Sequence, residues 1–331
     1  MRARTLGRSD VPVTALGFGA AAIGNLLTPV GDEAAYAALD AAWDAGIRYF
    51  DTAPHYGTGL SERRLGAYLR GRPAGSYTLS TKAGRLLVPA DGTGDDLRNG
   101  FAVPATHRRV WDFSAAGVRR SIEESLGRLG LDAVDVVYLH DPDDHAEQAF
   151  TQAYPELERL RGEGLVGAIG AGMNQAAMLT RFVRDTDVDV VLCAGRYSLL
   201  DQRALPALLP AAAARGVSVV VGGVFNSGLL ADPRQGGTFD YARAAPHLVA
   251  RALEFKELAE RHGTSLRAAA LAFPFGHPAV TGVLVGTRSA AEVLDTAEQF
   301  AAPVPAAFWA EARDRGLLDP DTPAPGPKES A

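Results

Sequence analysis

The sequence predicts a closed (β/α)8 barrel, the TIM-barrel fold, on three observations. Short apolar, β-branched runs alternate with helical stretches along the chain, which is typical of parallel α/β folds. The runs are apolar on both faces, as buried parallel strands require. Eight such units follow one another within 331 residues without a break in composition, which favours one barrel over two open sheets. An open doubly wound sheet is the alternative fold.

The strands are expected in chain order. Two short extended segments at residues 5–7 and 11–13 are predicted to form an N-terminal β-hairpin. The barrel strands are then expected at residues 14–18, 48–51, 78–82, 134–140, 166–170, 188–193, 217–221 and 281–285. Each of these segments is bounded by polar or glycine-rich residues, as strands usually are.

Start and stop signals mark the helices between these strands. Asp32, Ser61 and Ser114 are expected to cap the first three helices, and Gly46 and Gly130 to end the first and the third. A fourth helix is expected around residues 157–160. Further helices are expected at residues 176–184, 204–215, 246–262 and 290–299.

Two segments are too long and irregular for ordinary connections. Residues 84–112 are rich in Gly, Asp and Arg, and residues 230–245 contain Pro and Gly. Loops of such length usually serve as lids or binding loops, so we expect both at the C-terminal face of the barrel. Residues 1–318 are predicted to form a single domain, and the Pro-rich residues 319–331 a disordered tail.

The composition limits the classes of function. The chain is 47% hydrophobic and 22% charged, and its 33 Lys and Arg against 39 Asp and Glu give a net charge of −6, which argues against broad binding to nucleic acid or to an anionic membrane. Its single cysteine, Cys193, excludes an internal disulfide and a cysteine-based metal site. No signal-like start or long apolar run occurs, so a cytosolic location is expected.

Ionisable side chains are predicted where three of the strands end. Asp51, Lys82 and His140 close the second, third and fourth barrel strands, and Tyr56 follows Asp51 in the next loop. In a parallel barrel these ends meet at one mouth. Each residue alone has an ordinary explanation as a helix cap, a solvent-exposed lysine or a core histidine. The four at adjacent strand ends together predict an active site.

The four residues suit proton transfer to or from a carbonyl or alcohol oxygen. A tyrosine with a pKa near 10 exchanges a proton poorly at neutral pH, and a neighbouring ammonium lowers that pKa. Lys82 is expected to supply this charge and Asp51 to orient it, while His140 holds the substrate oxygen. A cofactor would carry the hydride, and no metal is expected.

Three segments resemble the aldo-keto reductase superfamily in order and spacing, over the chain to about residue 318. They are FDTAPHYGTGLSERRLG (50–66), LSTK (79–82) and RSIEESLGRLGLDAVDVVYLHDPD (120–143). The resemblance implies that Tyr56 is the general acid and base, that Lys82 and Asp51 lower its pKa, and that His140 orients the carbonyl.

Four later segments resemble one branch of that superfamily. Residues 169–175, 194–202, 219–233 and 285–295 look like the branch of the L-fucose, L-galactose and D-threo-aldose 1-dehydrogenases and pyridoxal 4-dehydrogenase. The resemblance implies oxidation of the anomeric hydroxyl of a sugar, or of a related hemiacetal, to a lactone.

The resemblance also implies a nicotinamide coenzyme lying across the barrel mouth, and the sequence contains no GxGxxG motif that would support a Rossmann site. Arg288 suits a 2′-phosphate, so NADP is preferred over NAD. The residues implied for the coenzyme are Gly19, Ala20, Asp51, Asn174, Phe225, Asn226, Ser227, Gly286, Thr287, Arg288, Ser289, Glu292 and Asp295.

The chain departs from many members of the superfamily at three places. Gly172 and Met173 stand where many members have Ser-Asn, Ala194 replaces a Gln, and Asp295-Thr296 replaces Glu-Asn. These departures concern carboxamide and adenine recognition and leave the four catalytic candidates unchanged.

A small-molecule substrate is expected, and three residues are candidates to contact it: His55, Trp111 and Tyr197. Arg108 and Arg109 are expected to be a solvated pair. Three other functions remain as alternatives: a coenzyme-binding regulatory module with little turnover, a reductase of a secondary-metabolite carbonyl, and a barrel hydrolase or isomerase. The substrate, the reaction direction and the oligomeric state stay open.

Overall fold

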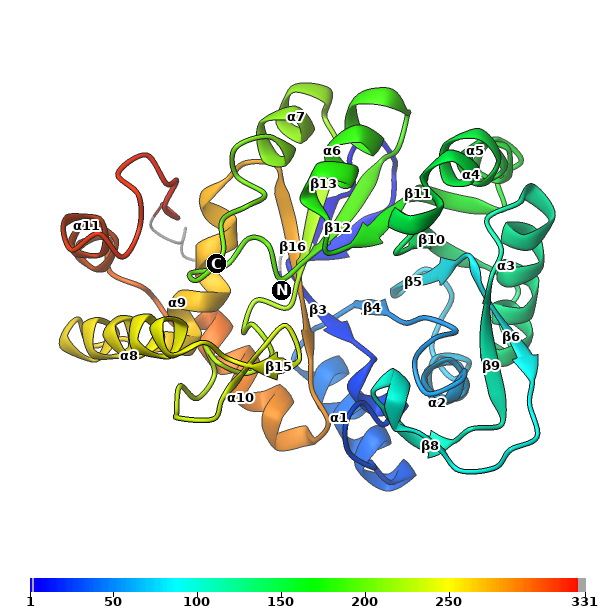
Figure 1. Ribbon diagram of the computed structural model, residues 1–331, viewed down its shortest axis with the longest axis horizontal. Coiled ribbons are helices and arrows are strands. Elements are labelled where there is room, and N and C mark those ends of the chain that lie inside the picture. The colour runs from blue at the N-terminus through cyan, green and yellow to red at the C-terminus, as the bar shows by residue number, and fades with distance from the viewer. Residues whose placement is uncertain (2, 327–331) are drawn as a thin grey trace.

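The structure is a computed structural model that describes residue 1 and residues 3–326. Eight parallel strands close into a barrel with helices around it, which confirms the predicted fold (Figure 1). Each strand pairs with the barrel strand before it in sequence, and the last pairs with the first. The barrel strands are β3 (Leu16–Gly19), β4 (Tyr49–Asp51), β5 (Thr78–Ala83), β10 (Val134–His140), β11 (Val166–Met173), β12 (Val190–Ala194), β13 (Ser218–Gly222) and β16 (Val280–Gly286).

The helices follow the predicted order and include two, α9 and α11, that the sequence analysis did not predict. The longer helices are α1 (Asp32–Asp44), α2 (Leu60–Leu69), α3 (Ala115–Leu129), α5 (Tyr154–Gly162), α6 (Ala176–Asp185), α7 (Leu208–Arg215), α8 (Pro246–Arg261), α9 (Leu266–Ala272), α10 (Ala290–Ala301) and α11 (Ala306–Asp314). Short helical turns occur at η1 (Ala22–Gly24), η2 (Leu97–Asn99), η3 (Asp143–His145), α4 (Ala146–Gln148), η4 (Ala149–Ala153) and η5 (Phe273–Gly276).

One of the three predicted helix caps is confirmed and two are wrong. Ser114 caps α3 by accepting a hydrogen bond from the Gly117 amide. Asp32 lies inside α1 and pairs with Arg64 instead. Ser61 lies inside α2, and its hydroxyl donates to the Ala20 carbonyl at 2.8 Å. A capping side chain must precede the helix in extended backbone, and neither residue occupies that position.

The predicted hairpin, β1 (Ala3–Thr5) with β2 (Pro12–Thr14), fills one end of the barrel. Its residues Leu6, Val11 and Val13 belong to one apolar cluster with side chains from inside the barrel, including Tyr49 and Tyr138. Because this N-terminal end is packed, the open end of the barrel is the one formed by the carboxyl ends of the strands.

The two long segments contain more regular structure than expected. In residues 84–112, β6 (Arg85–Pro89) pairs with β9 (His107–Trp111), and β7 (Asp95–Asp96) pairs with β8 (Phe101–Pro104). These strands lie beside α2 and α3 (Figure 1). Backbone hydrogen bonds tie this segment to the loop after β3, from Leu27 to Gly100 and from Ala102 to Asn25. Residues 230–245 contain the short hairpin of β14 (Thr238–Phe239) and β15 (Ala242–Arg243).

Part of the predicted disordered tail is packed in the structure. Thr322 is buried, and its carbonyl accepts a hydrogen bond from Arg313 at 2.8 Å. For residues 327–331, disorder stays a prediction that lies outside the described residues. The single domain over residues 1–318 also stays a prediction. None of the helices described in residues 1 and 3–326 has both the length and the apolar character needed to cross a membrane.

Close packing of α2 on α3 requires glycine at position 66. A Cβ atom added to Gly66 would lie 2.0 Å from the Leu129 carbonyl oxygen. We expect Gly66→Ala to lower the free energy of unfolding by about 3 kcal/mol, because the helices must move apart. Chemical denaturation measures this change.

Gly127→Ala is the matched control. Gly127 is an exposed glycine inside α3, and its added Cβ would meet nothing within 4 Å. This variant should gain up to about 1 kcal/mol, because alanine favours a helix interior. Equal stabilities for the two variants would contradict the proposed close packing.

Candidate active site

The four predicted catalytic residues come together at the open end of the barrel. Lys82 Nζ donates to Asp51 Oδ2 at 2.6 Å and to the Thr52 carbonyl at 2.9 Å. It lies 4.7 Å from the centre of the Tyr56 ring. The His140 ring stands perpendicular to that of Tyr56, with 5.9 Å between their centres. The register of the adjacent strands β4, β5 and β10 brings these side chains to one place.

A column of hydroxyl groups inside the barrel supports Asp51 from below. The Ser80 hydroxyl donates its proton to Asp51 Oδ1 at 2.7 Å and lies 3.3 Å from the Tyr49 hydroxyl, which is hydrogen-bonded to that of Tyr138 at 3.0 Å. Both oxygens of Asp51 are therefore occupied, one by Ser80 and one by Lys82. Ser80 was not among the predicted site residues, although it stands two residues before Lys82 and so points to the same face of the strand.

The electrostatics of Tyr56 differ from the expectation in one respect. Burial raises the pKa of Tyr56 to about 12, and the Lys82 ammonium opposes this shift without cancelling it. Burial also opposes the charge of Lys82, but Asp51 and Tyr56 outweigh it and the pKa of Lys82 is raised. In this structure Lys82 is therefore charged and Tyr56 is a protonated phenol, rather than one acidified below its usual pKa.

Two neutral histidines flank Tyr56. Burial, with help from Arg85 and Lys82, holds the pKa of His140 well below its usual value. His140 Nδ1 is buried and has no hydrogen-bond partner among the described residues, while Nε2 lies 3.7 Å from Asp141 Oδ2. His140 thus has a buried polar atom without a protein partner, in a ring that packs against that of Tyr56.

His55 is the predicted substrate residue that the structure places in the same ring cluster. Its ring centre lies 5.7 Å from that of His140, 6.2 Å from that of Tyr56 and 5.1 Å from that of Phe101. Burial lowers the pKa of His55 to about 2, with smaller contributions from Arg85 and Arg109. His55 is therefore uncharged over the ordinary pH range.

The prediction of a solvated Arg108–Arg109 pair is wrong for Arg109. Its guanidinium is buried, bonds to both carboxylate oxygens of Asp96 and donates from Nε to His55 Nδ1 at 2.8 Å. Arg108 is exposed as expected. Successive residues of a strand point to opposite faces, so the two arginines of β9 have different surroundings.

Trp111 lies at the edge of this cluster rather than inside it. It is 41% exposed, and the Arg85 guanidinium lies over its ring at 4.2 Å. Arg85 also forms an ion pair with Asp141, directly after His140. Trp111 therefore remains accessible to a substrate at the barrel mouth.

The prediction that Tyr197 contacts substrate is contradicted. Its side chain is fully buried, and its ring packs on that of Phe273 with 5.0 Å between centres. It belongs to the apolar core and does not line the cavities described next. Arg196, the preceding residue, is directed to the other side of the chain and pairs with Asp240 at 2.7 Å.

Two adjoining cavities, of about 240 and 390 Å³, extend from Asp51 and Tyr56 across the barrel mouth. They share walls at Gly223, Ser227 and Gly286. Eleven of the thirteen residues implied for the coenzyme line them: Gly19, Asp51, Asn174, Phe225, Asn226, Ser227, Gly286, Thr287, Arg288, Glu292 and Asp295.

Two of the implied coenzyme residues do not line the cavities. Ala20 is buried, and its amide donates to the Asp51 carbonyl at 2.8 Å. Ser289 caps α10 by accepting a hydrogen bond from the Glu292 amide. Both residues therefore hold the backbone beside the cavities. A sequence match does not distinguish a residue with this role from one that lines a cavity.

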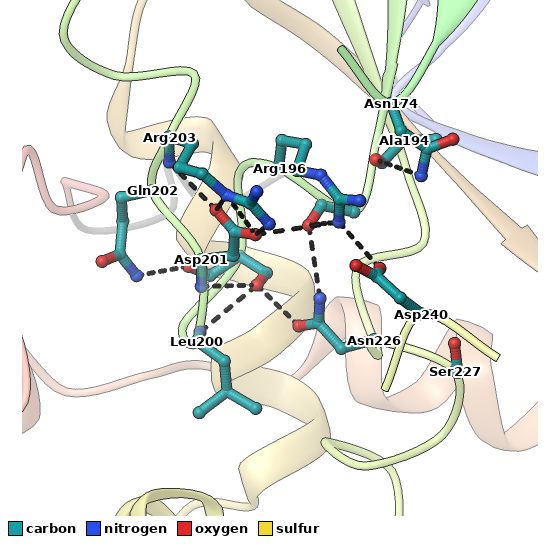
Figure 2. Close-up of polar contacts among 12 residues, drawn as sticks. Asn174, Ala194, Arg196, Leu200, Asp201, Gln202, Arg203, Asn226, Ser227 and Asp240 are labelled. Atoms are coloured by element: carbon teal, nitrogen blue, oxygen red, sulfur yellow. Dashed lines mark hydrogen bonds and ion pairs between the residues drawn. The ribbon is translucent and has the colours of Figure 1, made fainter. Parts of the chain in front are cut away.

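A polar network holds the wall formed by Asn226. Its side chain accepts from Ser198 at 2.6 Å and donates to the Gly195 carbonyl at 3.4 Å. Figure 2 shows Arg196 between Asp201 and Asp240, so the same network reaches the β14–β15 hairpin. Asn226 and Ser227 both have left-handed backbone, with φ of 45° and 57°, and this network fixes that uncommon turn.

The lining residues fit an elongated anionic ligand such as a dinucleotide. Gly222, Gly223 and Gly286 leave backbone bare along the cavities, so a ligand can approach closely. Arg267 and Arg288 line the second cavity near the start of α10, where amide groups favour an anion. The Thr287 hydroxyl in that wall is buried and has no hydrogen-bond partner within the described part of the chain.

Comparison with known proteins gives one family. The profile of the Aldo/keto reductase family matches residues 15–314. D-threo-aldose 1-dehydrogenase of Pseudomonas sp is 46% identical over 316 residues, covering 94% of this chain and 96% of that protein. Pyridoxal 4-dehydrogenase of Microbacterium luteolum is 39% identical, covering 95% and 97%, and L-galactose dehydrogenase of Arabidopsis thaliana is 32% identical, covering 88% and 85%.

Solved structures give the same fold. The holo form of an aldo-keto reductase from Bacillus halodurans has a TM-score of 0.75 at 26% identity, covering 96% of this chain and 97% of that one. The glycerol dehydrogenase of Gluconobacter oxydans has a TM-score of 0.74 at 23% identity, covering 99% and 98%. The second likeness is one of fold alone.

Proposed function

Because the chain belongs to the aldo/keto reductase family, it is an NAD(P)-dependent oxidoreductase, and we propose that it is an aldose 1-dehydrogenase with Tyr56 as its general acid and base. One observation carries this assignment of roles: the Lys82–Asp51 ion pair lies beneath the Tyr56 ring, and Asp51 and Tyr56 both line the cavity. The coenzyme, when bound, supplies or accepts the hydride.

The protein groups handle the proton and the substrate oxygen. In oxidation, Tyr56 as phenolate takes the proton from the anomeric hydroxyl, and the Lys82 charge stabilises that phenolate. In reduction, the Tyr56 phenol donates its proton to the carbonyl oxygen, which His140 holds by a hydrogen bond. Asp51 keeps Lys82 charged and in place through the 2.6 Å bond.

The substrate class rests on the relatives and on the character of the pocket. Two of the relatives are named D-threo-aldose 1-dehydrogenase and L-galactose dehydrogenase, which supports a sugar hemiacetal as substrate and oxidation as the physiological direction. Asn174 lines the cavity together with Tyr56, and the neutral rings of His55 and His140 lie beside that of Tyr56. These groups suit a small uncharged polyol. The expected cytosolic location stays a prediction.

We propose NADP as the preferred coenzyme. Arg288 is half-exposed in the cavity wall, and its guanidinium reaches Thr28 at 3.1 Å and Glu292 at 3.6 Å. Such a guanidinium can turn from a surface carboxylate to a phosphate, which it binds through two parallel hydrogen bonds. The 2′-phosphate distinguishes NADP from NAD, so Arg288 determines the preference.

Replacing Tyr56 with Phe removes the exchangeable proton and keeps the ring. We expect kcat for an aldose to fall by about 10³-fold, within the range usual for loss of a general acid or base. Coenzyme affinity, measured by titration of protein fluorescence, should change less than about twofold, since the phenol hydroxyl is assigned to the substrate. Turnover at the wild-type rate would refute the role of Tyr56.

The pH dependence should differ between the two directions. Since the pKa of Tyr56 is about 12, the phenolate fraction rises about tenfold per pH unit below that value. Oxidation limited by chemistry should therefore accelerate from pH 7 to pH 10, whereas reduction, which uses the phenol, should stay flat. Both histidines stay neutral over this range and add no inflection. An oxidation rate that levels off near pH 7 would contradict the raised pKa.

Replacing Arg288 with Ala tests the coenzyme preference. We expect KM for NADP to rise at least about tenfold, and KM for NAD to change less than about twofold, because only NADP carries the 2′-phosphate. Arg261→Ala is the matched control, since Arg261 lies on α8 in an ion pair with Glu311. Equal effects of Arg288→Ala on both coenzymes would remove the basis for the preference.

A further inference from the structure

The side chain of Arg109 joins the segment of residues 84–112 to His55, whose ring lies beside those of Tyr56 and His140. It comes from β9, and it crosses to the loop after β4, where its Nε donates to His55 Nδ1 and its Nη2 to the His55 carbonyl, both at 2.8 Å. One guanidinium therefore holds both the ring and the backbone of His55, across 54 residues of sequence.

Asp96 keeps this guanidinium in a fixed orientation. Its two carboxylate oxygens accept from Arg109 Nη1 and Nη2 at 2.5 and 2.6 Å. The side chains are only 7% and 3% exposed. Such a bidentate pair permits one geometry for the guanidinium plane, so Nε is directed at His55.

This contact determines which nitrogen of His55 carries the proton. A guanidinium has donors and no acceptor, so the Nδ1 atom it bonds must present a lone pair. His55 is neutral and therefore has a single ring proton, which must be on Nε2. No described group accepts a hydrogen bond from Nε2, and His55 is partly exposed beside the Tyr56 and His140 rings.

We infer that Arg109 and Asp96 fix His55 as an Nε2–H donor to a hydroxyl group of the substrate next to the reacting carbon, so that the segment of residues 84–112 selects polyhydroxylated substrates. This inference rests on the proposed function, because it assigns a role within that active site. A donor with no protein partner rejects an analogue that lacks the matching hydroxyl, since the analogue leaves it unpaired. Arg109 and Asp96 are positioning residues, and His55 is the residue that contacts the substrate.

Three replacements of His55 test the position of the donor. Glutamine carries an amide N–H at a reach similar to Nε2, asparagine carries one nearer Nδ1, and phenylalanine carries none. With an aldopentose as substrate, we expect kcat/KM to fall at least about tenfold in His55→Phe and His55→Asn, and His55→Gln to recover most of the loss.

A second substrate separates selectivity from general damage. 2-Hydroxytetrahydropyran has the same reacting hemiacetal and no other hydroxyl group. The ratio of kcat/KM for the aldopentose to kcat/KM for 2-hydroxytetrahydropyran should fall at least about tenfold in His55→Phe and His55→Asn and recover in His55→Gln, because only the aldopentose offers His55 a further hydroxyl to bind. The inference is overturned if His55→Gln falls as far as His55→Phe, or if both substrates lose activity equally.

The role of Arg109 has a readout independent of turnover. Nitrogen-15 NMR of the histidine rings reports which nitrogen is protonated, and we expect His55 to carry its proton on Nε2 in the wild type. In Arg109→Gln/Asp96→Asn, which removes the buried charges together so that neither is left unpaired, an Nδ1–H form should appear. Arg108→Gln, on the exposed face of the same strand, should leave the spectrum unchanged.

These outcomes separate the inference from the proposed function. If the wild type turns over neither the aldopentose nor 2-hydroxytetrahydropyran with either coenzyme, the proposed function is wrong. If both are substrates and the tautomer is the same in the double variant and the wild type, the inference fails and the proposed function stands.

Discussion

An ammonium group buried inside a protein is costly unless a carboxylate and further hydrogen bonds compensate it, and the arrangement of this active site follows from that constraint. Lys82 is 3% exposed and remains charged because Asp51 lies 2.6 Å away. Asp51 is fixed in turn by Ser80, and below Ser80 lie the bonded hydroxyls of Tyr49 and Tyr138. The hairpin packs the far end of the barrel, so this polar column is closed to water on that side. The charge of Lys82 can therefore act on the one group above it, the Tyr56 phenol.

Three buried or partly buried ion pairs surround the reacting groups, and each lies beside a different residue of the ring cluster. Lys82–Asp51 lies beneath Tyr56 and partly offsets the rise of its pKa on burial, Arg85–Asp141 lies next to His140, and Arg109–Asp96 holds His55. Each cation has its own carboxylate, so the net charge near the substrate stays small while the local fields remain strong. Both histidines are kept neutral by burial and by these cations. Neutral side chains suit the uncharged sugar proposed as substrate, whereas charged histidines would favour an acidic one.

The polarity pattern was enough to predict the barrel, its hairpin and the four residues at the mouth, because the carboxyl ends of all strands in a parallel barrel lie at the same face. Side chains whose partners are remote in sequence were predicted wrongly. Asp32 and Ser61 look like helix caps in the sequence. In the structure Asp32 forms an ion pair with Arg64, and the Ser61 hydroxyl donates to the Ala20 carbonyl. Arg109 looks like a surface charge beside Arg108, yet its partners His55 and Asp96 come from two other segments. Tyr197 follows a strand as the residues at the barrel mouth do, but its ring packs in the core against Phe273.

The sequence by itself determined which groups lie at the mouth, since strand order and the alternation of side chains are local properties of the chain. It also determined that Lys82 and Ser80 share a face. Only the tertiary structure decided how those groups ionise, because burial depends on every element packed around them: the pKa of Tyr56 rises where an isolated Tyr–Lys pair would lower it. The tautomer of His55 was likewise decided by an arginine 54 residues away, through a bond whose direction no local pattern encodes.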